Sequence, residues 1–147
     1  MEEGPKLFTV EEANALVPVL EFEFGRLARL RSELGPLIAA LGGADVSVGV
    51  LKGGGPVPSG REAEALRLRQ VAAEITAGIE RVNALGCLVK DVEAGLVDFH
   101  ATLDGEAVLL CWQFGEPAVS HWHREGEGFA GRKPIEGVTI EWPEYMN

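Results

Sequence analysis

The segment VDFHATLDGEAVLLCW, residues 97–112, decides the fold of the C-terminal part of the chain. Its centre, Asp104-Gly105, is a dipeptide typical of two-residue β-hairpin turns. Such a turn fixes the register of both strands. Leu103 lies opposite Glu106, and each following pair lies one residue further from the turn on both strands. The pairs on one face are then Ala101 with Val108, Phe99 with Leu110 and Val97 with Trp112. Because all six are apolar or aromatic, the turn and the hydrophobic pattern predict the same hairpin.

The opposite face of this hairpin carries polar and reactive side chains. The same register sets Asp98 opposite Cys111 and His100 opposite Leu109. Alternate residues of a strand share a face, so Asp98, His100 and Cys111 are predicted to be near neighbours.

The next strand lies in the segment SHWHREGEGFAGR, residues 120–132, which contains His121 and His123. Two registers against the Cys111 strand are open. In the first, His121 faces Cys111, His123 faces Leu109, and both histidines join the polar face. In the second they shift by one residue onto the apolar face, where burying imidazoles is costly unless they are hydrogen-bonded. The first register is therefore favoured.

In the favoured register five candidate ligands share one sheet face, namely Asp98, Cys111 and His123 with His100 and His121 as weaker members. Imidazole, thiolate and carboxylate groups suit zinc or another divalent transition metal. The first alternative is an ordinary polar sheet face without a ligand. A second alternative is a nucleophile and base formed by Cys111 with His100 or His121, although nothing nearby in the sequence marks an oxyanion hole. The sequence contains no Cys-x-x-Cys or His-Glu-x-x-His motif.

Residues 126–133 form a glycine-rich segment that ends in Arg132 and Lys133. Arg132 and exposed glycine amides are groups that hold a carboxylate or a phosphate. The favoured alternative is an internal ion pair of Arg132 with Glu116 or Asp98. Glu116 is also a candidate base for a water activated by a metal.

The N-terminal part predicts an antiparallel helical hairpin over residues 9–85. Thr9 and Glu12 form a capping box pattern at its start. Apolar residues then repeat at alternating steps of three and four, which is a heptad pattern. The two seams consist of Ala13, Val17, Leu20, Phe24, Leu27, Leu34, Ile38 and Leu41, and of Ala65, Leu68, Ala72, Ile75, Ile79 and Val82. Pro18 and Pro36 are expected to kink or end the first helix, and the Gly/Pro-rich residues 42–60 to form a loop or linker.

These patterns together predict an α+β protein with a single domain over residues 1–147. The helical hairpin precedes a small antiparallel β-meander of three to four strands in residues 86–147, and residues 138–142 are expected to form a short edge strand. A helical hairpin of this kind usually completes its core on a sheet or on a second copy of itself. We expect both, and therefore a homodimer through the helices.

Composition excludes several classes of protein. The chain has 147 residues and a formal net charge of −10, which argues against a nucleic-acid partner. The N-terminus lacks the basic region and apolar run of a signal peptide, and no apolar run reaches membrane-spanning length. A cytoplasmic location is therefore expected, with Cys87 and Cys111 as thiols or ligands rather than a disulfide.

Several short phrases occur together along the chain. They are FTVEEAN at 8–14, VKD at 89–91, GLVDF at 95–99, LCW at 110–112, GE at 115–116, WH at 122–123 and GFAGRKP at 128–134. In combination they resemble a bacterial family catalogued as domain of unknown function twenty-two-oh-three. The resemblance implies a compact bacterial cytoplasmic protein with an N-terminal helical part, and it brings no activity.

The residues that match the family's phrases are Asp98, Trp112, Glu116, His123 and Arg132, whereas His100 and His121 lie outside them. This leaves Asp98, Cys111 and His123 as the core of the candidate site. Two functions follow as hypotheses. The first is a dimeric binding or assembly protein without established catalysis. The second is a small metalloprotein, with hydrolysis as a candidate activity.

Overall fold

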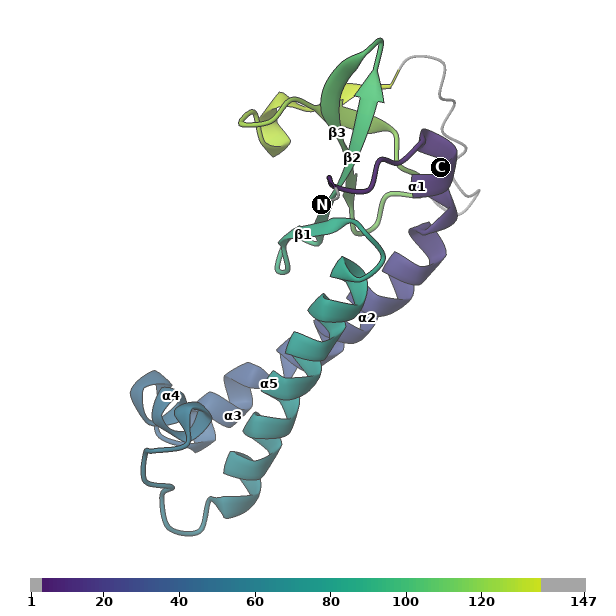
Figure 1. The fold of residues 1–147 in the computed structure, drawn as a ribbon. Helices are drawn as coiled ribbons and strands as arrows, with labels where there is room; N and C mark the ends of the chain where they lie inside the picture. Colours follow the sequence, from purple (N-terminus) through teal and green to yellow (C-terminus); the bar gives the residue numbers. More distant parts are fainter. Residues whose placement is uncertain (1–3, 136–147) are drawn as a thin grey trace. The chain divides into compact units, whose positions relative to one another are not determined.

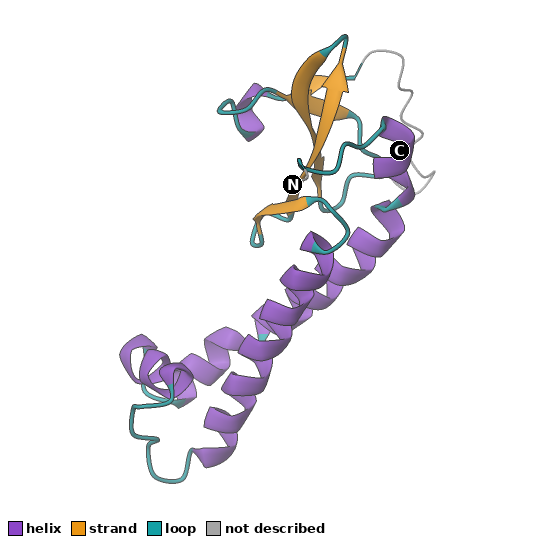
Figure 2. Cartoon of the chain, viewed as in Figure 1, coloured by secondary structure: helices purple, strands orange, loops and turns teal. Residues whose placement is uncertain are grey.

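The computed structural model describes residues 4–135, in which helices precede a five-stranded antiparallel sheet (Figures 1 and 2). The elements are α1 (Val10–Ala15), α2 (Val17–Ser32), α3 (Leu34–Ala40), α4 (Ala44–Lys52), α5 (Glu62–Asn83), β1 (Leu88–Asp91), β2 (Leu96–Leu103), β3 (Glu106–Gln113), β4 (His121–His123), the 3-10 turn η1 (Phe129–Gly131) and β5 (Lys133–Pro134). The predicted α+β class is confirmed. The sheet has five strands rather than three to four, and the strand expected at residues 138–142 lies outside the described residues.

The chain forms two compact units. Among the described residues, one unit, here called the sheet unit, combines residues 4–24 with residues 81–135. The other, the helical unit, consists of residues 25–80. Within residues 4–135 no single helix has both the length and the apolar composition for crossing a membrane. A bent pair of helices, Val17–Ala40 with Ala44–Lys52, passes that test only when the two are taken together.

The predicted first helix is divided into α1, α2 and α3. Its start has the expected capping box, in which Thr9 Oγ1 accepts the Glu12 amide at 3.0 Å and Glu12 Oε1 accepts the Thr9 amide at 2.9 Å. The interruptions fall at Leu16 and Glu33, shortly before Pro18 and Pro36. Proline has no amide hydrogen and is tolerated in the first turn of a helix, so each proline lies near a new start.

The prediction that residues 42–60 lack regular structure is wrong for α4. This helix begins after Gly43 and ends at Gly53, which has the left-handed conformation of a helix C-cap. Valines, glycine and serine are weak helix formers, so local propensity does not predict α4. Burial compensates for this weakness: Val50 is fully buried in an aliphatic cluster of the helical unit with Leu41, Ala65 and Leu68.

The sheet has the strand order β1-β2-β3-β4-β5. The β2–β3 register agrees at every predicted pair, from Leu103 opposite Glu106 to Val97 opposite Trp112. The favoured β3–β4 register is also confirmed, since Cys111 pairs with His121 and Leu109 with His123.

The apolar face of the sheet forms the core of the sheet unit. Phe99 and Trp112 are fully buried there, and the ring of Phe8 packs edge-on against Phe99 at 5.1 Å between centroids. Helix α1 lies beside the sheet (Figure 1) and is attached through Asn14. Asn14 Oδ1 accepts the Val119 amide at 2.7 Å, and Asn14 Nδ2 donates to the Val119 carbonyl at 3.3 Å. These contacts leave the second sheet face for the candidate site.

Candidate metal site

Three neighbouring strands each contribute one side chain to a buried polar cluster. Asp98 comes from β2, Cys111 from β3 and His123 from β4. One carboxylate oxygen, the thiol sulfur and one ring nitrogen all lie within 4.8 Å of one another. The three residues are only 3%, 2% and 4% exposed. We call this set the Asp98–Cys111–His123 cluster.

The ring of His123 is held by both of its nitrogens. Nδ1 lies 2.9 Å from the Arg124 carbonyl oxygen, and Nε2 lies 3.1 and 3.2 Å from the two oxygens of Asp98. Because a carbonyl oxygen only accepts, Nδ1 carries the hydrogen of this contact. Nε2 then either donates to Asp98 from a charged imidazolium or presents a lone pair toward the carboxylate. In the second case, a cation bound by both Nε2 and the carboxylate would remove the repulsion between the lone pair and the carboxylate oxygens.

The thiol of Cys111 lies in an unfavourable environment for a free thiolate. The pKa of Cys111 is raised to about 12. Burial is the main cause, the charge of Arg132 acts against it, and the charges of Asp98 and Glu116 act in the same direction as burial. The thiol is therefore protonated near neutral pH, which argues against the alternative of a cysteine nucleophile. A metal ion reverses this preference, because a coordinating thiol is deprotonated.

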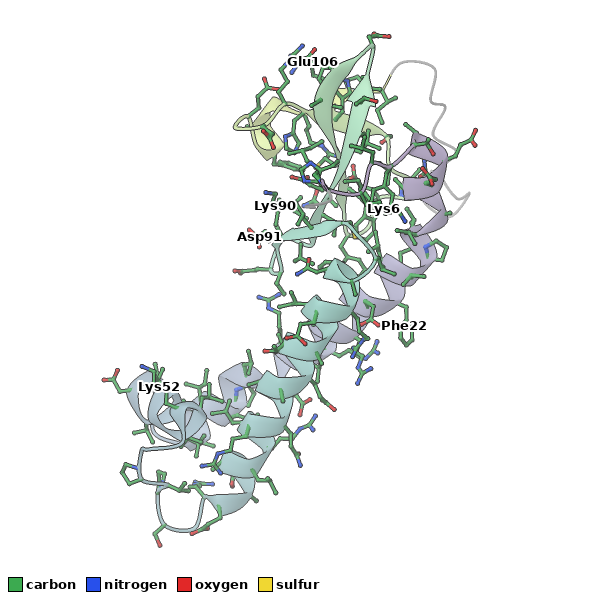
Figure 3. All side chains as sticks on the ribbon, in the orientation of Figure 1. Lys6, Phe22, Lys52, Lys90, Asp91 and Glu106 are labelled. Carbon is green, nitrogen blue, oxygen red and sulfur yellow. The ribbon has the colours of Figure 1, made fainter. Side chains whose placement is uncertain are left out.

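The cluster opens onto a cavity of about 680 Å³ on the same sheet face. Apolar walls come from Leu88, Leu96, Leu109 and Phe129, and His100 also lines the space. Lys90 and Asp91 belong to the lining as well, and Figure 3 shows both on β1. A volume of this size suits a small organic ligand.

The two weaker histidine candidates lie outside the cluster. His100 lines the cavity but is not one of the three grouped ligands. His121 points elsewhere, with Nδ1 at 2.9 Å from Ser120 Oγ and 3.9 Å from Glu116 Oε2. Burial lowers the pKa of His121, the nearby charge of Arg132 acts in the same direction, and Glu116 opposes it. The neutral form of His121 is therefore favoured.

Arg132 and Glu116 form the internal ion pair that the sequence favoured over an anion site. Arg132 Nη2 donates to Glu116 Oε1 at 2.8 Å and to Oε2 at 3.1 Å. Glu116 Oε1 also accepts the Gln113 amide at 2.7 Å. Glu116 is not among the residues that line the cavity, so its contacts support a structural role in the turn after β3 rather than the role of a base.

Comparison with protein families identifies the chain. The model of the family described as "Uncharacterized conserved protein (DUF2203)" matches residues 6–135. The chain belongs to this family. No curated protein and no solved structure matches it. Membership in DUF2203 confirms the resemblance seen in the short phrases, and because its description carries no activity, the function must be argued from the site.

Two features of this DUF2203 chain were not recognised in its sequence. Nothing in the sequence of the glycine-rich segment 126–133 indicates that the Phe129 side chain lines the cavity. Its flanking glycines signal a special loop conformation but not the direction in which the ring points. Glu23 was not singled out at all, although it is 8% exposed and paired with Arg81 at 3.0 Å. The only sign in the sequence that Glu23 is buried is its place between two apolar positions of the heptad seam, Leu20 and Phe24.

Proposed function

We propose that this protein binds one divalent transition metal ion, preferably zinc, through Asp98, Cys111 and His123. The observation that carries the proposal is the grouping of three buried ligand types from three adjacent strands, with their ligand atoms within 4.8 Å of one another. A carboxylate, a thiol and an imidazole are costly to bury together unless they are paired or coordinate a metal. One thiolate, one imidazole and one carboxylate suit zinc, which accepts sulfur, nitrogen and oxygen ligands.

The distances in the cluster support this proposal. Ligand atoms around tetrahedral zinc lie roughly 3.3–3.7 Å apart, as follows from metal–ligand bonds of about 2.0–2.3 Å. His123 Nε2 already lies at about this spacing from the oxygens of Asp98, at 3.1 and 3.2 Å. The widest separation in the cluster, at most 4.8 Å, would have to contract by about 1 Å. The contact of His123 Nδ1 with the Arg124 carbonyl is the kind of outer contact that orients a histidine ligand and fixes its tautomer.

Three protein ligands leave one position of a tetrahedral zinc ion for a ligand from the cavity. This is the arrangement of catalytic zinc sites, whereas structural sites are closed by four protein ligands. A water bound at such a position is activated as a nucleophile. Metal-assisted hydrolysis is therefore the reaction class that we would screen first.

The test is the metal content of tag-free protein after loading with zinc and dialysis, measured by elemental mass spectrometry. We expect about one zinc ion per chain for the native protein. Asp98→Asn, Cys111→Ser and His123→Ala should each lower this content strongly. Circular dichroism of each variant separates loss of metal from loss of fold.

The strands supply matched controls for this experiment. His121→Ala changes a histidine on the same strand as His123 and should leave the zinc content unchanged, because its ring contacts Ser120. His100→Ala tests the other cavity histidine in the same way. Native protein that retains no zinc would overturn the proposal and leave the contact of Asp98 with His123 as a structural ion pair.

A second candidate function, assembly as a homodimer, is favoured by a separate observation. Val19 and Phe22 are three positions apart on α2, so they share a helix face, and they are 42% and 64% exposed. Figure 3 shows Phe22 projecting from α2. The residues of the heptad seam from Ala13 to Leu27 do not form an exposed apolar surface, because they are buried within the chain.

Light scattering at micromolar concentration tests the assembly proposal. We expect a dimer for the native chain and a monomer for the Val19→Ser/Phe22→Ser double variant, because the exposed apolar face would be lost. Leu66→Ser, at an exposed position of α5, is the control. A native chain that is strictly monomeric would exclude assembly through this face.

A further inference from the structure

The cavity next to the Asp98–Cys111–His123 cluster has apolar walls from four elements of the sheet unit. Leu88 and Leu96 come from β1 and β2, Leu109 comes from β3, and Phe129 comes from η1. On the same side, Asp98, Cys111 and His123 supply the groups that would hold the metal. Lys90, Asp91, His100 and Glu125 add further polar groups to the lining. The space thus has a site for a coordinating head group and a separate apolar surface.

Phe129 is an exposed aromatic residue in the wall of this cavity, and its ring packs against the side chain of Arg132. Phe129 is 42% exposed as a residue, and the guanidinium of Arg132 lies 4.6 Å from the centroid of its ring. The side chain of Arg132 is itself only 12% exposed and is bound to Glu116. The ion pair between Arg132 and Glu116 therefore supports the position of the Phe129 ring, in addition to its structural role in the turn after β3.

The loop that carries Phe129 is closed at its base by Glu127. Its carboxylate accepts the Arg124 amide at 2.7 Å and the ammonium of Lys133 at 3.2 Å. At Gly131 a side chain would clash, because a Cβ atom would lie 2.6 Å from Cβ of Glu127. These contacts fix both ends of the loop around the phenyl ring, so the wall is built into the fold.

We propose that the cavity binds a small organic molecule with an apolar body, whose coordinating head group occupies the open position of the metal. This inference rests on the proposed metal site and names the class of ligand that the site takes. The head group is an oxygen donor, such as a carboxylate or hydroxamate, because the open position of a catalytic zinc site is taken by an oxygen ligand from water or substrate. The body lies against Leu88, Leu96, Leu109 and Phe129.

The probes for this proposal are acetohydroxamic acid and octanohydroxamic acid, titrated into protein loaded with cobalt(II). Both carry the same head group, so the change in the cobalt absorption spectrum reports coordination for each. The longer probe adds six methylene groups. Because a fully buried methylene is worth about fourfold in affinity, even partial burial should make octanohydroxamic acid more than about tenfold tighter.

Variants of the wall separate the apolar contact from coordination. Phe129→Ala and Leu88→Ala should reduce the preference for the longer probe severalfold while the affinity for acetohydroxamic acid stays the same. Phe22→Ala is the matched control, since Phe22 is exposed on α2 and is not among the cavity residues. Arg132→Gln should weaken the preference as Phe129→Ala does, because the ring loses its support.

The outcomes distinguish this proposal from the metal site on which it rests. Equal affinities for the two probes would overturn the apolar ligand while leaving the metal site and its open position. A cobalt spectrum that neither probe changes would overturn the open position. Failure of the protein to bind cobalt or zinc at all would remove the proposed function and this inference together.

Discussion

The two compact units of the chain bury different kinds of side chain. The core cluster of the helical unit is aliphatic, with Leu41, Val50, Ala65 and Leu68, and its ion pair between Arg67 and Glu33 is about 40% exposed on both sides. The sheet unit has an aromatic core on one face of the sheet. On the other face it buries the carboxylate, thiol and imidazole of the Asp98–Cys111–His123 cluster.

This difference separates what folding needs from what a site needs. Aliphatic burial stabilises a fold without any requirement for pairing. A buried carboxylate and imidazole lose hydration, and well-packed apolar residues of similar volume are often as stabilising or more so. The helical unit shows that the chain builds a core without such groups. The polar cluster of the sheet unit is therefore the feature on which the proposed metal binding rests.

The largest expected effect on stability is that of replacing His123, and it tests this proposal directly. In the presence of a chelator, His123→Ala should lower the free energy of unfolding by about 3–5 kcal/mol, because Asp98 stays buried without its partner. The double variant Asp98→Leu/His123→Leu should recover most of that loss, since neither polar group remains. Denaturant titration measures both, and zinc binding should be absent from both. A double variant as unstable as the single one would show that the cluster serves the fold.

The helical unit offers the converse experiment. Leu68→Ala should cost about 2–5 kcal/mol, because it leaves a cavity in the aliphatic cluster. The zinc content of the folded variant should not change. Leu66→Ala, at a position that is 55% exposed, is the control and should shift stability by less than about 0.5 kcal/mol. A loss of zinc in folded Leu68→Ala would contradict the separation of roles between the units.

The β2–β3 hairpin could be predicted in detail because one local signal set its register, whereas β5 was not predicted. Asp104 and Gly105 have the positive φ angles of their turn, and every β2–β3 pair followed from them. The cost of burying His121 and His123 on an apolar face then selected the correct β3–β4 register. The candidate ligands could be assigned to one face for the same reason.

Strand alternation alone could not predict which of these side chains meet, because it determines a face but not how far a side chain reaches. Only the resemblance to the family singled out Asp98, Cys111 and His123. His123 contacts Asp98 across the intervening strand, whereas His121 turns to its neighbour Ser120. Helix α4 was missed for a related reason. Its stability comes from the contact of Val50 with residues distant in the sequence, which no local pattern records.

Asn14 is a polar residue of the sheet unit whose role should be purely structural. Its amide group accepts from and donates to the backbone of Val119. Asn14→Ala should cost about 1–3 kcal/mol, since the Val119 amide and carbonyl lose these partners. Asn14→Asp keeps the acceptor for the amide and should cost less.

Thermal unfolding and zinc content together test this assignment. Both Asn14 variants should bind zinc as the native protein does, unlike variants of the cluster. Reduced zinc binding in a folded Asn14 variant would show that the attachment of α1 positions β4, and the division between structural and binding polar groups would have to be redrawn.

The smallest effect on stability is expected for the ion pair between Arg67 and Glu33 in the helical unit. Hydrogen bonding to Arg67 lowers the pKa of the Glu33 carboxyl. A lowered pKa means that the folded state favours the carboxylate. The resulting contribution to stability is therefore present above the ordinary pKa of a glutamate and is lost as the pH falls through the lowered value. Arg67→Gln should raise the pKa of Glu33 toward its usual range.

Carboxyl NMR titration of Glu33 measures this change, and an unchanged pKa in Arg67→Gln would show that the pair does not form in solution. The stability of the variant at neutral pH should hardly differ from that of the native protein, because both groups are well solvated. Glu33 with Arg67 and Asp98 with His123 are the same kind of pairing in different surroundings. Water can replace Arg67 as the partner of Glu33, whereas buried Asp98 needs either His123 or a metal ion.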